Sequence, residues 1–207
     1  MASETDKTSQ EKETGKSTKS DLPILSFETQ KYWEFWLSQN YDLQTGVWIR
    51  FFKKGSGISS IVYDQALDGA LCYGWIDGQL KKLDENSYIQ KFTPRRTKSM
   101  WSKRNIDHVS RLEKEGKMQS SGIREVENAK KDGRWERAYD SPGKMEIPED
   151  FIQELSKNEN ALEFFESLNK VNKYSIGWRL QTAKNQETRE KRIKEILAMM
   201  GKDEKFH

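Results

Sequence analysis

Residues 75–94, WIDGQLKKLDENSYIQKFTP, constrain the possible folds more than any other stretch of this sequence. Two runs of strand-like side chains flank the turn-forming residues DENS. Pro94, which cannot donate to a central ladder, ends the second run. The pattern predicts a β-hairpin. Alternation along its first strand places four side chains on one face: Trp75, Asp77, Gln79 and Lys81.

The sequence before the hairpin predicts one more strand and two helices. Residues 46–55, GVWIRFFKKG, have the β-branched and aromatic composition of a strand between two glycines. Ser26 is expected to cap a short aromatic helix ahead of that strand. Residues 63–74, which include Cys72, present one apolar face at helical spacing.

After the hairpin the pattern becomes helical. Ser102 is expected to cap a helix that stops at Gly116, and a second helix, over residues 121–132, stops at Gly133. From Pro148 onward, apolar residues recur at helical spacing. The fold class is therefore predicted to be α+β: a small antiparallel or mixed sheet packed with helices, followed by a helical C-terminal unit.

The chain is expected to divide into three parts. Residues 1–20 contain no aromatic residue and no aliphatic residue larger than alanine after Met1, so we expect a disordered polar tail. The tail lacks the apolar stretch of a signal peptide. Residues 21–147 form the α+β body with the candidate site, and residues 148–207 form the helical unit.

Cysteine, histidine and hydropathy patterns bear on compartment and cofactors. No run approaches the ~18 apolar residues of a membrane span, so no membrane insertion is expected. The single cysteine, Cys72, fits a reducing compartment and excludes an internal disulfide and a cysteine zinc site. With only His108 and His207, no histidine-rich metal centre is expected. We therefore expect a cytoplasmic protein without cofactor or metal, although carboxylate-only metal binding stays open.

The positive charge of the chain is concentrated in residues 91–104. This block contains six Lys and Arg residues and no acidic residue, whereas residues 21–90 carry a net charge of −3 and the remaining segments are neutral. A helix starting at Ser102 could hold an anion on its first turn, with Arg95 and Arg96 positioned by Pro94. Alternatively, the cations are solvated or paired with acidic residues of the hairpin: Asp77, Asp84 or Glu85.

Three further features each allow a functional and a structural interpretation. Asp77 could be a general base in a pocket, or the partner of Arg95 or Arg96 in a structural salt bridge, which we favour. Cys72 and His108 could form a nucleophile and its base, but a buried core thiol is favoured. The helices over 102–116 and 121–132 could be a helix-turn-helix, but their mixed charge favours an αα-hairpin that closes the sheet.

Three passages resemble a known family. They are ALCYGWIDGQLKKLDE, FTPRRTKSMWSKRN and GWRLQTAKNQETREKRIKEIL, and they resemble the family labelled bacteriocin-protection protein, YdeI or OmpD-associated. The resemblance implies tolerance of antimicrobial proteins and envelope stress, without an established reaction or cofactor. It covers these positions: Trp75, Asp77, Arg95, Arg96, Trp101, Ser102 and Asn105. The chain departs from the family in its polar tail and at Arg179, where members more often have an apolar residue.

The residues and the resemblance together favour a ligand-binding protein over an enzyme, and no catalytic residue is assigned. The expected partner is a small anionic ligand such as a phosphorylated molecule. The alternatives are an enzyme acting on a phosphorylated or carboxylated small molecule, a nucleic-acid-binding protein, and an assembly partner. An unpaired Asp77 in a deep pocket would favour the enzyme, and an exposed Trp101 on a basic face would favour polyanion binding. The expected ligand-binding residues are Trp75, Asp77, Gln79, Arg95, Arg96, Trp101, Ser102, Lys103 and Asn105.

Overall fold

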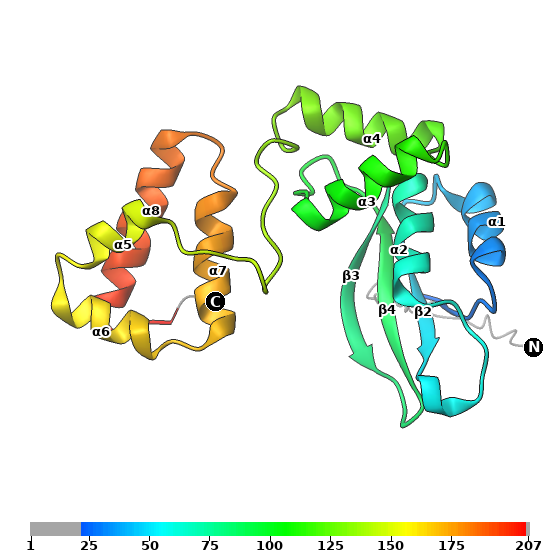
Figure 1. Cartoon of the computed structure of the whole chain (residues 1–207), viewed down its shortest axis with the longest axis horizontal. Helices are drawn as coiled ribbons and strands as arrows, with labels where there is room; N and C mark the ends of the chain where they lie inside the picture. The colour runs from blue at the N-terminus through cyan, green and yellow to red at the C-terminus, as the bar shows by residue number, and fades with distance from the viewer. Residues whose placement is uncertain (1–21, 206–207) are drawn as a thin grey trace, which may run out of the picture.

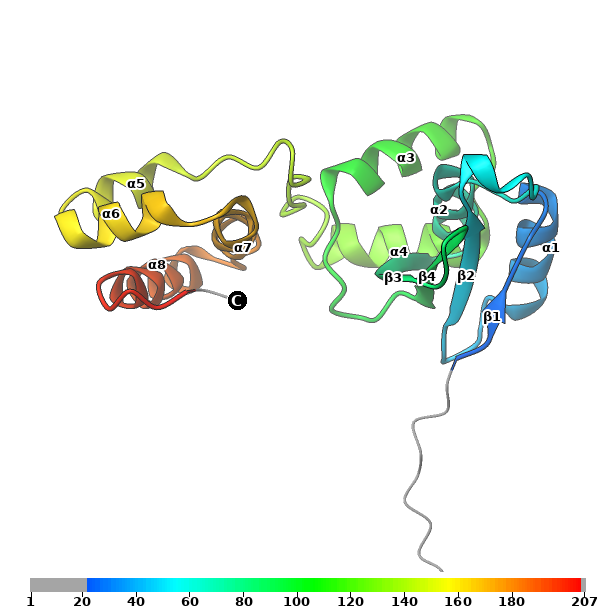
Figure 2. The same cartoon turned by 90° about the horizontal axis from the view of Figure 1, so that it is seen from below.

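Four strands form one mixed sheet in the order β1-β2-β4-β3 (Figures 1 and 2). The computed structural model describes residues 22–205, so the predicted polar tail and His207 lie outside the described residues. Strand β1 runs parallel to β2, and the other two neighbouring pairs are antiparallel. The strands are β1 (Ile24–Leu25), β2 (Val47–Phe52), β3 (Trp75–Lys82) and β4 (Ser87–Pro94). The predicted hairpin is confirmed, including its end at Pro94.

A β-bulge changes which residues of β3 share a face. Asp77 pairs with Phe92 but Leu80 pairs with Gln90, so β3 contains one more residue than β4 over this interval. Beyond the bulge, Leu80 lies on the same face of the sheet as Trp75 and Asp77, whereas Gln79 and Lys81 lie on the other face. The predicted alternation is therefore wrong for these two residues, because an inserted residue reverses the side-chain period.

Helices α1 (Gln30–Asn40) and α2 (Tyr63–Cys72) pack together over the sheet (Figures 1 and 2). Their contact is close because Gly69 faces the Trp33 ring, where an added Cβ would lie 2.8 Å from the nearest ring atom. The Trp33 indole N–H donates to the Ala66 carbonyl at 2.9 Å. The inner face of the sheet is buried under these helices through Trp33, Leu37, Val47, Ile49, Phe51, Trp75 and Phe92.

The predicted start of α1 at Ser26 is wrong. The N-cap is Thr29, whose hydroxyl accepts a hydrogen bond from the Tyr32 amide at 3.4 Å. Phe27 is buried in the core, and its carbonyl accepts from the Ile61 amide at 3.0 Å. These tertiary contacts hold the chain around Phe27 outside the helix.

Helices α3 (Lys103–Lys114) and α4 (Ser120–Lys131) form an αα-hairpin against α2 (Figure 2). Gly116 and Gly133, which follow the two helices, have φ values of 66° and 74°, as predicted for helix ends. The apolar faces of α3 and α4 share a cluster with α2. This cluster includes Leu67, Leu71, Cys72, Trp101, Val109, Leu112, Val126 and Ala129. The main contacts of α3 and α4 are with α2 and not with the sheet, so the predicted role of closing the sheet is not confirmed.

The C-terminal unit contains helices only. They are α5 (Glu149–Leu155), α6 (Glu159–Ser167), α7 (Lys170–Gln181) and α8 (Gln186–Met200), and they enclose their own apolar cluster. The segment 133–148 joins this unit to the sheet-containing unit (Figure 1). Contacts from this segment reach α7: the rings of Tyr139 and Trp178 lie 5.9 Å apart, and the Gln181 side chain contacts Asp140. Within residues 22–205, no helix is both long and apolar enough to cross a membrane.

Candidate functional site

Two of the predicted ligand-binding residues, Trp75 and Gln79, do not share a site with the other predicted residues. Trp75 is completely buried in the core, and its indole N–H donates to the Tyr41 carbonyl at 2.9 Å. Gln79 is exposed and lies beyond the start of the bulge, on the other face of the strand. The structure therefore gives Trp75 a packing role and separates Gln79 from the other predicted residues.

Asp77 is held by neutral donors instead of an arginine. Its Oδ2 accepts from the Tyr63 hydroxyl at 2.9 Å and from the Gln90 amide at 3.0 Å. Burial and the Asp77 carboxylate both raise the pKa of Tyr63, so its hydroxyl keeps its proton. Among the described residues Asp77 forms no ion pair with Arg95 or Arg96. The predicted salt bridge is therefore wrong, and the carboxylate is not unpaired either.

Arg95 is the unexpected residue of the basic block, because its charged side chain is buried. The residue is only 7% exposed, and its guanidinium carbon lies 3.4 Å from the centroid of the Trp101 ring. Nη1 donates to the Met100 carbonyl at 3.3 Å, and the backbone amide donates to Gly74. Burial lowers the pKa of Arg95 to about 9. The side chain is thus fixed in place but poorly solvated.

One edge of the Arg95 guanidinium has no acceptor. Within the described part of the chain, the buried atoms Nε and Nη2 lack any hydrogen-bond partner, as does Nε1 of the stacked Trp101. In a planar guanidinium, the Nε–H and one N–H of Nη2 point the same way and can bind two oxygens of one carboxylate or phosphate. An unpaired buried donor costs about 1–3 kcal/mol. Nε and Nη2 of Arg95 are therefore buried donors whose hydrogen bonds are unsatisfied by the described residues.

Residues distant in sequence complete the surroundings of Arg95. Tyr139, Asp77 and Glu125 act on Arg95 electrostatically and raise its pKa, whereas Arg134 lowers it. Arg134 is itself 5% exposed, with Nη1 donating to the Ser99 carbonyl at 2.8 Å and Nε bound to Asp132. Sequence reasoning missed Arg134 and Tyr139, because nothing in their local pattern distinguishes them from surface residues.

The start of α3 is largely satisfied by the protein itself. Ser102 caps the helix as predicted, with its Oγ accepting from the Asn105 amide at 3.2 Å. The Lys103 amide donates to the Tyr139 carbonyl at 2.8 Å. Two of the first-turn donors are therefore already bound. Ser102 and Asn105 are both buried, and they support the local fold next to the Arg95–Trp101 stack.

The remaining cations of the block do not form a continuous track. Lys103 pairs with Asp140 at 2.9 Å, and Arg104 pairs with Asp64 at 2.8 Å. Arg96 is exposed, whereas Arg95 is buried. Trp101 is 1% exposed, so its ring offers no open platform for stacking. The pairing predicted with Asp84 and Glu85 is wrong, because these carboxylates bind Arg50 and Lys82.

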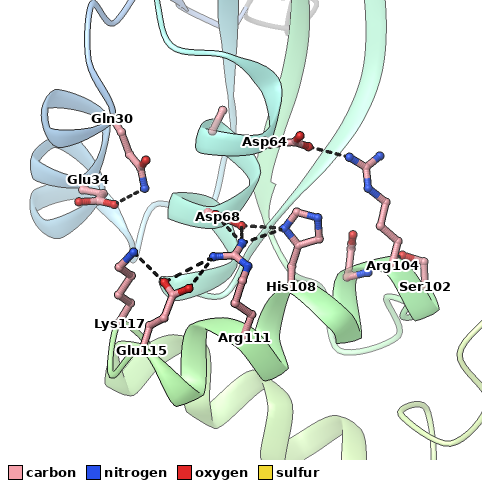
Figure 3. Close-up of polar contacts among 12 residues, drawn as sticks. Gln30, Glu34, Asp64, Asp68, Ser102, Arg104, His108, Arg111, Glu115 and Lys117 are labelled. Atoms are coloured by element: carbon pink, nitrogen blue, oxygen red, sulfur yellow. Dashed lines mark hydrogen bonds and ion pairs between the residues drawn. The ribbon is translucent and has the colours of Figure 1, made fainter.

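His108 belongs to a network of ion pairs between α2 and α3 (Figure 3). Its Nδ1 lies 2.7 Å from Asp68, which also accepts from Arg111 at 2.6 Å. Figure 3 shows Glu115 and Lys117 extending this network along the end of α3. These contacts tie the two helices together.

Cys72 has the environment of a core thiol. The residue is 5% exposed within the cluster between α2, α3 and α4. Burial raises the pKa of its thiol to about 12. Because the thiolate is the nucleophilic form, this burial disfavours a nucleophilic role for Cys72. The structure therefore supports the packing interpretation of Cys72.

Two family models match separate parts of the chain. Residues 25–125 match "Domain of unknown function (DUF8412)", and residues 144–202 match "Bacteriocin-protection, YdeI or OmpD-Associated". No significant match was found among curated proteins or among solved structures.

The second match lies on the helical unit. Of the three passages that carry the resemblance, only GWRLQTAKNQETREKRIKEIL falls within residues 144–202; the other two, with Arg95 and Trp101, fall within residues 25–125. At the position of the departure, Arg179 is half-buried and pairs with Glu195 of α8 at 3.3 Å. Residues 144–202 therefore match the family model described as Bacteriocin-protection, YdeI or OmpD-Associated, whereas most of the sheet-containing unit matches a different model.

Proposed function

We propose that this chain is a cytoplasmic binding protein whose sheet-containing unit holds a small anion at Arg95. The observation that carries the proposal is the buried Nε/Nη2 edge of Arg95, which lacks an acceptor. A carboxylate or a phosphate supplies two oxygens at the spacing that this edge requires. The family of the C-terminal unit suggests a role for this binding in protection against bacteriocins or other antimicrobials.

The plane of the Arg95 guanidinium is fixed in this structure, in which Nε and Nη2 are closed to solvent, so the proposed anion reaches them only when the segments around Arg95 move apart. Trp101 stacks against one face of it, and the Met100 carbonyl accepts from Nη1. Such preorganisation reduces the entropy lost on binding. Trp101 Nε1, also without a partner among the described residues, adds a third donor close to the same stack.

The alternatives receive less support from the geometry. An enzyme with Asp77 as general base would need that carboxylate free, but Tyr63 and Gln90 both donate to it. A nucleic-acid-binding surface would need clustered exposed cations and an open aromatic ring. Instead, Lys103 and Arg104 are paired with acidic residues, and Trp101 is buried.

Arg95→Lys tests the proposal with a conservative change. Lysine keeps the charge but lacks the parallel pair of donors. We expect calorimetric titration with sulfate, inorganic phosphate and acetate to show binding to the unmodified chain, and about tenfold weaker binding to Arg95→Lys, since one charge-assisted hydrogen bond contributes about 1.5–3 kcal/mol. Arg96→Lys is the matched control, because Arg96 is the exposed neighbour.

Equal affinities of Arg95→Lys and Arg96→Lys would contradict the proposal, as would the absence of binding for all three anions. The melting temperature of each variant shows whether it is folded. Native mass spectrometry of the purified chain would also detect a ligand that remains bound.

The pH dependence of sulfate binding is a second test. Only the protonated guanidinium binds an anion, and the pKa of Arg95 in the ligand-free protein is about 9. Affinity is therefore expected to be constant well below pH 9 and to fall by about tenfold for each pH unit above it. Sulfate keeps its charge throughout this range, so titrations at constant ionic strength report on the protein. An affinity that is the same at pH 7 and pH 10 would contradict the lowered pKa of Arg95.

A further inference from the structure

A cleft of about 690 Å³ lies between the loop after β2 and the sheet. Its lining contains Tyr88, which is half-buried and stacks on the buried ring of Phe51 from the paired strand, with centroids 5.2 Å apart. Its apolar wall is formed by residues of the loop that leads into α2: Ile58, Ile61 and Val62. Neither Arg95 nor Trp101 lines this cleft, so it is distinct from the proposed anion site.

The cleft leaves apolar side chains open to solvent. Ile58 is 54% exposed and Val62 is 57% exposed, although both lie beside the buried Ile61. A volume of 300–1,000 Å³ lined by aromatic and branched side chains is typical of sites for small molecules. An apolar ligand body in the cleft would bury these side chains together with the face of Tyr88.

The charge of the lining is entirely positive. Lys53 and Lys54 line the cleft, and no Asp or Glu does. The Lys53 ammonium donates to the Glu85 carbonyl at 2.8 Å, which leaves its charge unneutralised. Within residues 22–205, Lys54 forms no ion pair. Ser59 and Ser60 also line the cleft.

The start of α2 lies at the border of the cleft. Its N-cap is Val62, which lines the cleft together with Tyr63 and has no side-chain acceptor for the first-turn amides. The first turn of the helix also contains Asp64, so the positive charge of the cleft comes from Lys53 and Lys54 and not from the helix start.

We infer that this cleft binds a small carboxylic acid with an aromatic or branched apolar body. The body packs on Tyr88, Ile58 and Val62, and the carboxylate lies near Lys54. The apolar lining selects against small hydrophilic anions, and the unneutralised lysines select against neutral apolar molecules. This ligand class follows from the pairing of an apolar surface with charge of one sign.

The test compares three probes by calorimetric titration. 2-Naphthoate has both the apolar body and the carboxylate, 2-naphthalenemethanol lacks the charge, and acetate lacks the body. We expect 2-naphthoate to bind more tightly than either of the others. Lys54→Gln should weaken 2-naphthoate binding about fivefold, as expected for one partly solvated ion pair. Lys98→Gln, a change of the same kind at another exposed lysine, should have no effect.

Val62→Asp is a second test of the cleft, in a variant that is expected to remain folded. Asp is a favoured N-cap residue, so this change should raise the melting temperature while it places a negative charge at the border of the cleft. Binding of 2-naphthoate should then be lost. The inference is overturned if the alcohol binds as tightly as the acid, or if Lys54→Gln and Lys98→Gln have the same effect. Arg95→Lys should leave 2-naphthoate binding unchanged, so this site and the proposed Arg95 site are tested separately.

Discussion

Phe151→Ala is expected to destabilise the C-terminal unit by about 3–5 kcal/mol, which is the usual cost of removing a buried phenylalanine side chain. Phe151 is completely buried on α5, and its ring packs edge-on against Phe165 of α6 with centroids 5.9 Å apart. The apolar cluster around it contains residues of the helical unit and none from the sheet-containing unit. We therefore expect the helical unit to unfold at a lower denaturant concentration while the sheet-containing unit keeps its transition.

Tryptophan fluorescence and circular dichroism during urea unfolding would measure the two transitions. Six of the seven tryptophans lie at or before Trp135, so fluorescence reports mainly on the sheet-containing unit and the start of the joining segment. Circular dichroism also reports on the C-terminal helices. Val171→Ala is the matched control. Val171 is 71% exposed on α7, and a surface change of this kind should alter stability by no more than about 0.5 kcal/mol. A single transition that shifts as a whole for Phe151→Ala would show that the two units fold as one.

Arg95→Met is expected to abolish anion binding without loss of stability. Two charge-assisted hydrogen bonds are lost, at about 1.5–3 kcal/mol each, so the affinity should fall at least about a hundredfold. Methionine fills much of the same space and removes a buried charge whose Nε and Nη2 lack acceptors in the described structure. The free energy of unfolding should therefore stay the same or rise by about 1 kcal/mol. Calorimetric titration and urea unfolding measure the two effects.

The stability measurement separates a binding role of Arg95 from a structural one. If Arg95 mainly anchors the loop through its bond to the Met100 carbonyl, Arg95→Met should cost stability. A destabilised variant that still binds sulfate would contradict the proposed site. Arg104→Met is the control, since Arg104 is an exposed arginine paired with Asp64 at 2.8 Å and should change neither quantity strongly.

Local sequence patterns predicted most elements of the sheet-containing unit because those elements have local causes. The turn residues DENS and the terminal Pro94 specify the hairpin, and Ser102 provides the cap that starts α3. The start of α1 was predicted wrongly, because burial of Phe27 and its bond to Ile61 are contacts with distant residues. Local capping preference was outweighed there by tertiary packing.

The candidate site was predicted only in part. The acid-free block led to the prediction of Arg95 and Trp101 as site residues. The sequence pattern does not show which of its six cations is buried. The structure buries Arg95, exposes Arg96, and pairs Lys103 and Arg104 with carboxylates. These differences depend on which distant segments pack against each side chain.

By itself, the sequence determined the α+β class, the hairpin and the helical character of the C-terminal unit, since periodicity and turn chemistry act over a few residues. Only the tertiary structure decided which charge of the basic block is buried. The segment after α4 returns to this block, where Arg134 binds the Ser99 carbonyl and the Tyr139 carbonyl accepts from Lys103. Burial depends on contacts across more than thirty residues of chain, and those contacts leave the Nε/Nη2 edge of Arg95 desolvated and without an acceptor in the described structure.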